Sequence, residues 1–210
     1  MSADDFIDKI MKDVYLYINT KLRPIAENCN ERVEGNIFEE DPNEKDIFLT
    51  KRKNIIVTSQ NKKNALEIGF NTGYSALLIL MSDPNIKLTC VDINTHKYVI
   101  PCYNQLKKDF GDRISLLTGD SRIVVPNIND KFDLVHIDGC HHLNVAELDI
   151  TNTYKLLLNN AVIIMDDVNI YDNNHTLAML WKKYTNIYSY QAVPYELYHS
   201  IHHDIRCYAA

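Results

Sequence analysis

The sequence lacks paired cysteine motifs, long apolar runs and a basic leader. Its five cysteines are odd in number, and no two of them are separated by only two residues. Reduced thiols in a cytosolic protein fit this pattern better than a disulfide framework. The longest apolar runs, at 76–81 and 161–165, are far shorter than the roughly 20 residues of a transmembrane helix. The first residues are acidic where a secretory signal would be basic. We therefore expect a cytoplasmic protein.

The chain also lacks a basic arm. It carries 22 Lys and Arg against 28 Asp and Glu, a net charge of −6, and its richest basic cluster is Lys51-Arg52-Lys53. Proteins that bind nucleic acids usually present a basic face, so nucleic-acid substrates are disfavoured. A length of 210 residues with 46% hydrophobic side chains is typical of one globular domain with a modest extension.

The spacing of apolar residues predicts an N-terminal helix over 4–28 that ends near Pro24. The polar stretch 28–46 reads as a loop that could act as a lid, and 45–60 is helical in pattern. We divide the chain into a helical extension or lid, residues 1–60, and a ligand-binding domain, residues 61–210.

From residue 64 onwards, short apolar strands alternate with helices. Strands are expected at 65–68, 88–91, 114–117, 134–137 and 162–165, and helices at 73–82, 97–110, 143–157 and 173–184. This alternation predicts an α/β, Rossmann-like, doubly wound and mostly parallel sheet. Two last stretches, 187–193 and 205–208, suit an antiparallel C-terminal hairpin, which would make seven strands.

The first strand runs into a turn with two glycines, Gly69 and Gly73, before a helix begins. Glycine lets the backbone turn sharply and approach a ligand, and open α/β sheets bind nucleotides at such a place. A dinucleotide fingerprint would need a second glycine at Asn71. The carboxylate of Glu67 would repel a phosphate group and attract a cationic ligand. The alternative is a tight turn with no ligand.

The second strand ends at Asp92. An acid at this place can accept hydrogen bonds from both hydroxyls of a ribose. Capping of a helix, or a solvated loop position, is the other interpretation.

These motifs, followed by Gly119-Asp120-Ser121 and the segment 132–139, resemble the successive motifs of class I S-adenosylmethionine (SAM)-dependent methyltransferases. The resemblance covers about 145 residues in the right order. It implies that SAM is the cofactor, with Asp120 and Ser121 beside the adenine. The residues expected to bind SAM are Glu67, Gly69, Phe70, Asn71, Gly73, Tyr74, Ser75, Asp92, Ile93, Asp120, Ser121 and Asp138.

Three acids follow the fourth and fifth strands: Asp138, Asp166 and Asp167. Because parallel strands end at one edge, these carboxylates should meet, and they repel one another unless a cation joins them. Mg²⁺ or another divalent ion would serve. Alternatively, Asp138 orients SAM and Asp166 caps the next helix.

The pattern I-D-G-x-H-H followed by I-I-M-D-D resembles metal-dependent O-methyltransferases of the catechol type. It is more similar still to bacterial sugar and antibiotic-tailoring methyltransferases with an I-D-G-x-H segment. The catechol group has an Asp-Asn pair where this chain has Asp166-Asp167. It has a lysine base at the spacing of His141, so the resemblance implies that His141, with Asp138, is catalytic. His141 is alternatively a metal ligand or a helix-start residue, and the adjacent His142 has the same options.

We therefore expect a SAM-dependent O-methyltransferase that is assisted by a divalent metal and acts on a hydroxyl of a small molecule, with a sugar or glycan residue as a candidate. The metal would lower the pKa of the substrate hydroxyl, and His141 would take its proton. The alternatives are a NAD-dependent oxidoreductase and a non-catalytic methyltransferase-like binding subunit. A homodimer is left open.

Other polar residues are interpreted as ordinary surface. His199, His202 and His203 lie far along the chain from the acids and are expected at the surface. Lys51 and Lys53 are expected on a solvated helix face, with binding of an acidic substrate as the alternative.

Overall fold

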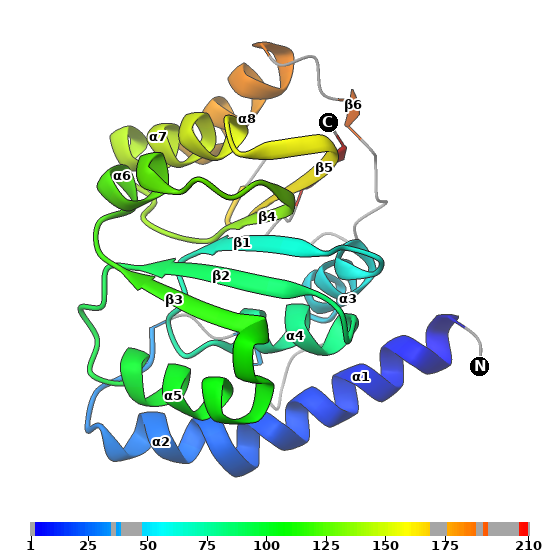
Figure 1. Ribbon diagram of the computed structural model, residues 1–210, viewed down its shortest axis with the longest axis vertical. Helices are drawn as coiled ribbons and strands as arrows, with labels where there is room; N and C mark the ends of the chain where they lie inside the picture. Colours follow the sequence, from blue (N-terminus) through cyan, green and yellow to red (C-terminus); the bar gives the residue numbers. More distant parts are fainter. Residues whose placement is uncertain are drawn as a thin grey trace.

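A computed structural model describes residues 3–34, 37–38, 48–168, 176–187, 191–192 and 206–209. At its centre five parallel strands have the order β3-β2-β1-β4-β5, which confirms the α/β, Rossmann-like class (Figure 1). The strands are β1 (Asn64–Ile68), β2 (Lys87–Asp92), β3 (Ile114–Thr118), β4 (Phe132–Ile137) and β5 (Leu157–Met165).

Two short strands continue the sheet beyond β5. β7 (Arg206–Ala209) pairs antiparallel with β5, and β6 (Gln191–Ala192) pairs antiparallel with β7. Of the hairpin expected at 187–193 and 205–208, residue 187 is helical, and the remaining residues outside β6 and β7 lie outside the described residues. His199, His202 and His203 also lie outside the described residues.

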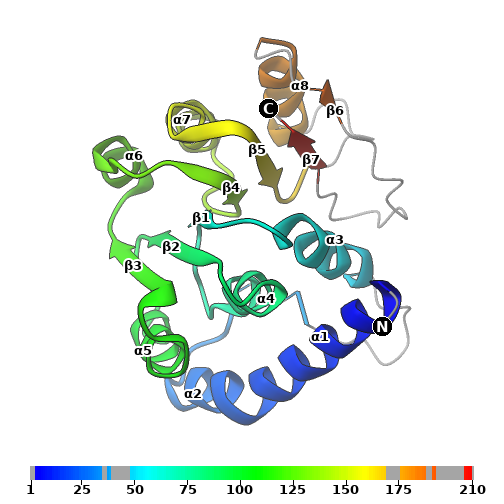
Figure 2. The same cartoon turned by 45° about the vertical axis from the view of Figure 1, so that its right-hand side comes forward.

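Helices cover both faces of the sheet, as the two views in Figures 1 and 2 show. Two separate apolar clusters lie beneath them, one on each face, because the central strands are apolar on both sides. The helices of the first face are α1 (Ala3–Tyr17), α2 (Arg23–Asn28), α3 (Leu49–Ser59), α4 (Tyr74–Ser82) and α5 (Val99–Phe110). Those of the second face are α6 (Ser121–Val124), α7 (Leu143–Tyr154) and α8 (Thr176–Ile187).

The N-terminal helix does not end near Pro24, so that expectation was wrong. α1 passes through a π-helical turn, Ile18–Leu22, directly into α2, with Pro24 in the first turn of α2. A proline within a continuous helix removes one hydrogen bond and crowds the preceding turn, and the wider π-helical turn lies directly before Pro24. The buried Ile18 and Leu22 hold this junction against the core.

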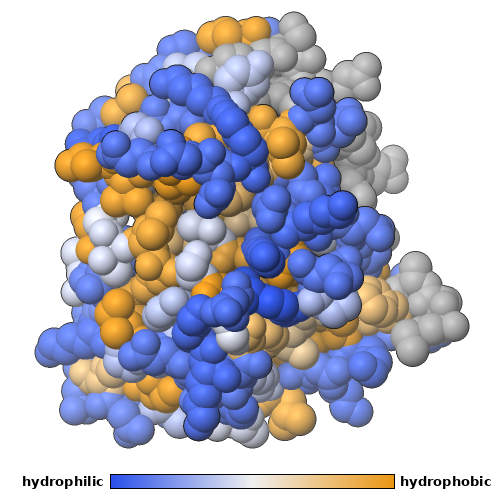
Figure 3. Space-filling view, viewed as in Figure 1, coloured by the Kyte–Doolittle hydropathy of each residue, from blue (hydrophilic) through white to orange (hydrophobic). Residues whose placement is uncertain are grey.

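No helix among the described residues is long and apolar enough to traverse a bilayer. On the face drawn in Figure 3, hydrophilic and hydrophobic residues are interspersed. Cys29, Cys90, Cys102 and Cys140 are free thiols.

Candidate active site

Two adjoining cavities lie at the carboxyl ends of the central strands, where open α/β sheets bind their ligands. Their volumes are about 590 Å³ and about 760 Å³. We call the first the acceptor cavity and the second the nucleoside cavity. The walls of both include Glu34, Gly69, Asn71, Asp138, Gly139, Cys140 and His142.

The turn after β1 brings its backbone against the loop after β4. Gly69 has a φ of +91°, and a Cβ built on it would lie 2.0 Å from the carbonyl oxygen of Asp138. Gly73 has a φ of +77°, and its Cβ would meet the ring of Phe70 at 2.6 Å. Only glycine fits either place. Gly69 is on the walls of both cavities, whereas Gly73 packs against Phe70 and Leu106 and is on neither wall.

The nucleoside cavity is built around Asp92, at the end of β2. Its Oδ2 accepts hydrogen bonds from the backbone N–H groups of Phe70 (2.8 Å) and Asn71 (2.9 Å). The acid therefore fixes the glycine turn, and a carboxylate retains further lone pairs for a ligand. Ile93 is 60% exposed and supplies apolar surface at the same wall.

Asp120 and Ser121 also line the nucleoside cavity. Asp120 caps α6 by accepting from the N–H of Arg122 at 2.9 Å, and it also binds the Arg122 guanidinium, with Nε at 3.0 Å. This pairing lowers the pKa of Asp120. Sequence reasoning missed Arg122, whose only signal was its place two residues after the capping acid.

Phe70, Asn71, Tyr74 and Ser75 lie on the wall of the acceptor cavity. Tyr74 and Ser75 begin α4, and both are mostly buried. Burial raises the pKa of Tyr74, so the group is a neutral phenol at physiological pH. The Asn71 side chain donates to the backbone oxygen of Glu34, which ties the N-terminal segment to the glycine turn.

Glu67 is fully buried in β1. Its carboxylate is 3.1 Å from Nδ1 of His136 and accepts from Sγ of Cys90 at 3.5 Å. These three residues are register neighbours on β2, β1 and β4, so their side chains share a face of the sheet. Burial raises the pKa of the Cys90 thiol. Glu67 is on the wall of neither cavity.

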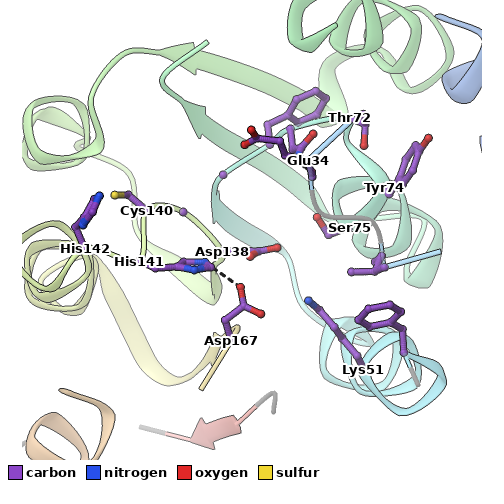
Figure 4. A pocket seen from close by; sticks show the side chains of 16 residues that line it. Glu34, Lys51, Thr72, Tyr74, Ser75, Asp138, Cys140, His141, His142 and Asp167 are labelled. Atoms are coloured by element: carbon purple, nitrogen blue, oxygen red, sulfur yellow. Dashed lines mark hydrogen bonds and ion pairs between the residues drawn. The ribbon is translucent and has the colours of Figure 1, made fainter. Parts of the chain in front are cut away.

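Two of the three acids expected to hold a metal are paired with basic side chains. Asp166 is 2% exposed and pairs with the ammonium of Lys51. Asp167 Oδ2 lies 2.9 Å from Nε2 of His141, the contact drawn dashed in Figure 4. Among the described residues, two groups offer atoms within 4.8 Å of one another: His136, Asp138 and Asp166 form one, and Asp138, His141 and Asp167 form the other.

His141 reaches the acceptor cavity from the loop after β4 (Figure 4). The hydrogen bond to Asp167 raises its pKa, and burial opposes that rise in part. His142 is the residue before α7 and makes no capping hydrogen bond with its side chain.

Lys51 is not on a solvated face, so that expectation was wrong. It is 7% exposed and extends from α3 into the acceptor cavity towards Asp138 and Asp167 (Figure 4). Ile55, one helical turn on, is fully buried. The shared face of Lys51 and Ile55 was the one signal in the sequence for this burial.

The described residues fit a divalent ion poorly. Lys51 is paired with Asp166 and lies on the same cavity wall as Asp138 and Asp167, so a cation is already present among these acids.

Residues 66–168 match a family model described as a methyltransferase domain. The match begins within β1 and ends after β5, so it includes the strand ends that form both cavities. This segment of the chain is similar to methyltransferase domains.

Solved structures of methyltransferases share the fold. The O-methyltransferase TomG from Streptomyces achromogenes, involved in tomaymycin synthesis and in complex with SAM, has a TM-score of 0.63 at 16% identity over 95% of each chain. The methyltransferase PaMTH1 from Podospora anserina, bound to S-adenosylhomocysteine (SAH), has a TM-score of 0.62 at 16% identity over 100% of this chain and 97% of its own.

The O-methyltransferase from Bacillus cereus in complex with SAH has a TM-score of 0.61 at 19% identity over 100% of this chain and 93% of its own. No curated protein sequence matches the chain.

Proposed function

We propose that the protein is a SAM-dependent methyltransferase that methylates a hydroxyl oxygen of a small molecule. The observation that carries this proposal is the junction of the two cavities at Gly69 and Asp138. An acid suited to a ribose lies on one side of the junction, and a base with its acidic partner lies on the other. SAM has the matching shape, with a nucleoside at one end and a charged amino acid at the other.

In the proposed complex the adenine lies beside Ile93, Asp120 and Ser121, and Asp92 accepts from the ribose hydroxyls. Asp138 accepts from the ammonium of the methionyl group. The carboxylate of that group lies near Ser75, in the first turn of α4, where helix N–H groups favour an anion.

His141 acts as the base in this proposal. Its ring takes the proton of the acceptor hydroxyl, while Asp167 holds the ring in place. The oxygen then attacks the methyl group of SAM in line. A carbon–oxygen bond forms, the carbon–sulfur bond breaks with its electrons on sulfur, and SAH remains. Holding both reactants in contact supplies much of the rate. Because the fit to a divalent ion is poor, no step uses the metal that the sequence motifs suggested.

Within the N-terminal extension, the described part of the loop after α2, residues 31–34 and 37–38, acts as a lid in this proposal. Glu34 is on the wall of both cavities, and Ile37 is on that of the acceptor cavity. The lid is anchored to the loop after β2, where Glu31 lies 2.8 Å from Nδ1 of His96 and accepts from the N–H of Lys97 at 2.7 Å.

The finer expectations from the sequence stay predictions. They are a sugar or glycan acceptor, a homodimer, a cytoplasmic location and a complete seven-stranded sheet with an antiparallel hairpin. An acceptor panel of catechols, phenols and sugars, assayed by the formation of SAH, tests the first.

Thermal unfolding tests the cofactor. A ligand that binds only the folded state stabilises it, so SAM and SAH at a large excess should each raise the melting temperature by several degrees. NADH serves as the control. No shift with SAM or SAH, or a shift with NADH alone, would contradict the proposal.

A further inference from the structure

Lys51 is a buried cation in the middle of an acidic site. Its side chain is 6% exposed and that of its partner Asp166 is 1% exposed. An unpaired charge at such depth is strongly unfavourable, so each of the two groups requires the other.

The Lys51 ammonium lies near other carboxylates in addition to that of its partner, Asp166. Asp138 and Asp166 offer atoms within 4.8 Å of each other, and Lys51 contacts Asp166 while facing Asp138 across the cavity (Figure 4). Asp167 and His141 complete the same wall. A divalent ion bound by these acids would come within a few ångströms of the ammonium, and like charges at that separation repel strongly.

We propose that Lys51 is the built-in cation of this site and takes the position and charge-balancing role of a divalent metal. The inference rests on the proposed function and narrows it to a methyl transfer without a divalent metal. Lys51 is then a positioning residue that keeps Asp166 and Asp138 ionised side by side.

The ammonium also faces the place of the acceptor hydroxyl. An ammonium carries three N–H donors, which is more than its ion pair with Asp166 uses. A donor on the cavity side stabilises the ionised form of the acceptor oxygen, which lowers the pKa of that hydroxyl and eases proton transfer to His141. The wall of the acceptor cavity carries more carboxylates than ammonium groups. The site therefore favours neutral hydroxyl compounds over carboxylate or phosphate substrates.

Binding of Mn²⁺, followed by electron paramagnetic resonance, tests the proposal without an acceptor. We expect wild-type protein to bind Mn²⁺ with a Kd no tighter than roughly 1 mM, at the weak end for protein sites of this kind. Lys51→Gln removes the charge, keeps a donor for Asp166, and should bind Mn²⁺ at least about tenfold more tightly because the acids lose their cation.

Three further variants make the test specific. Lys53→Gln, two residues along the same helix and only half-buried, should leave Mn²⁺ binding unchanged. Lys51→Arg keeps the charge and should also show no gain. Lys51→Gln combined with Asp166→Asn should abolish the gain, because the released carboxylate is gone.

Wild-type binding of Mn²⁺ in the micromolar range, or the same weak binding by wild type and Lys51→Gln, would overturn the role of Lys51. The shift in melting temperature with SAM is measured on each variant. If SAM does not raise the melting temperature of wild type, the proposed function is overturned. That outcome is separate from the Mn²⁺ result, which tests only the role of Lys51.

Discussion

At the scale of single residues, the proposed reaction depends on one proton acceptor. His141→Asn keeps a donor towards Asp167 but removes the base, so we expect turnover to fall by about 10²- to 10⁴-fold while the Kd for SAM stays within a few-fold. His142→Asn, at the adjacent position, is the matched control and should change turnover little. Equal losses in both variants, or none in His141→Asn, would contradict the assignment.

A second residue controls stability instead of chemistry. Asp149, on α7, is 1% exposed, and burial raises its pKa to about 6, against an opposing hydrogen bond from Ser121. The folded state therefore retains a proton that the unfolded state has released, and stability falls as pH rises from about 4 to about 6.

Asp149→Asn should remove this dependence. At pH 7.5 we expect the free energy of unfolding of the variant to exceed that of wild type by up to about 3 kcal/mol. Near pH 4 the two proteins should be almost equally stable. Urea titrations at the two pH values measure the effect. A variant that is less stable than wild type at pH 7.5 would show that the carboxylate has a stabilising partner.

Individual site residues were predictable where their role is fixed by backbone position. Gly69, Asp92 and Asp138 stand at strand ends, so their location follows from the strands alone. Glu67 and Lys51 were harder because their role depends on which way a side chain points. Glu67 belongs to the strand interior and turns towards His136, and Lys51 shares the buried face of α3.

At the scale of elements, the turn between β1 and α4 tolerates no side chain at its first glycine. Gly69→Ala would place Cβ 2.0 Å from a backbone oxygen, and backbone atoms cannot move aside without shifting β4. We expect a loss of several kcal/mol in stability and a loss of SAM binding.

Gly111→Ala is the control for the change in backbone conformation. Gly111 also has a positive φ of +60°, but its Cβ would meet nothing within 4 Å, so we expect only the cost of backbone strain, about 1–3 kcal/mol, and normal SAM binding. If both variants lose the same stability, the close contact with Asp138 is not the cause. Circular dichroism with a SAM titration measures both quantities.

The central elements could be predicted because apolar runs repeat at regular intervals, and all five parallel strands are present. Their ends were less certain. β5 begins at Leu157, where a helix was expected to continue, because its first four residues, two Leu and two Asn, are mostly exposed and show no buried strand pattern. α6 was missed because four residues are too few to show a helical period.

At the scale of the whole molecule, the N-terminal helices and the sheet share one apolar cluster. Val14, Ile18 and Ile55 pack with Leu77 and Leu106 in that cluster. The sequence could not predict this, since an amphipathic pattern shows that a helix has a buried face but not which element covers it. The extension thereby brings α3, and Lys51 with it, to the edge where the strands end.

The central claim is that SAM lies across the junction of the two cavities, and a crystal structure with SAH tests it most directly. We expect density for the ribose against Asp92 and for the amino acid group against Asp138, with the sulfur facing His141. SAH bound elsewhere, or cavities filled by the chain itself so that no ligand enters, would contradict the claim.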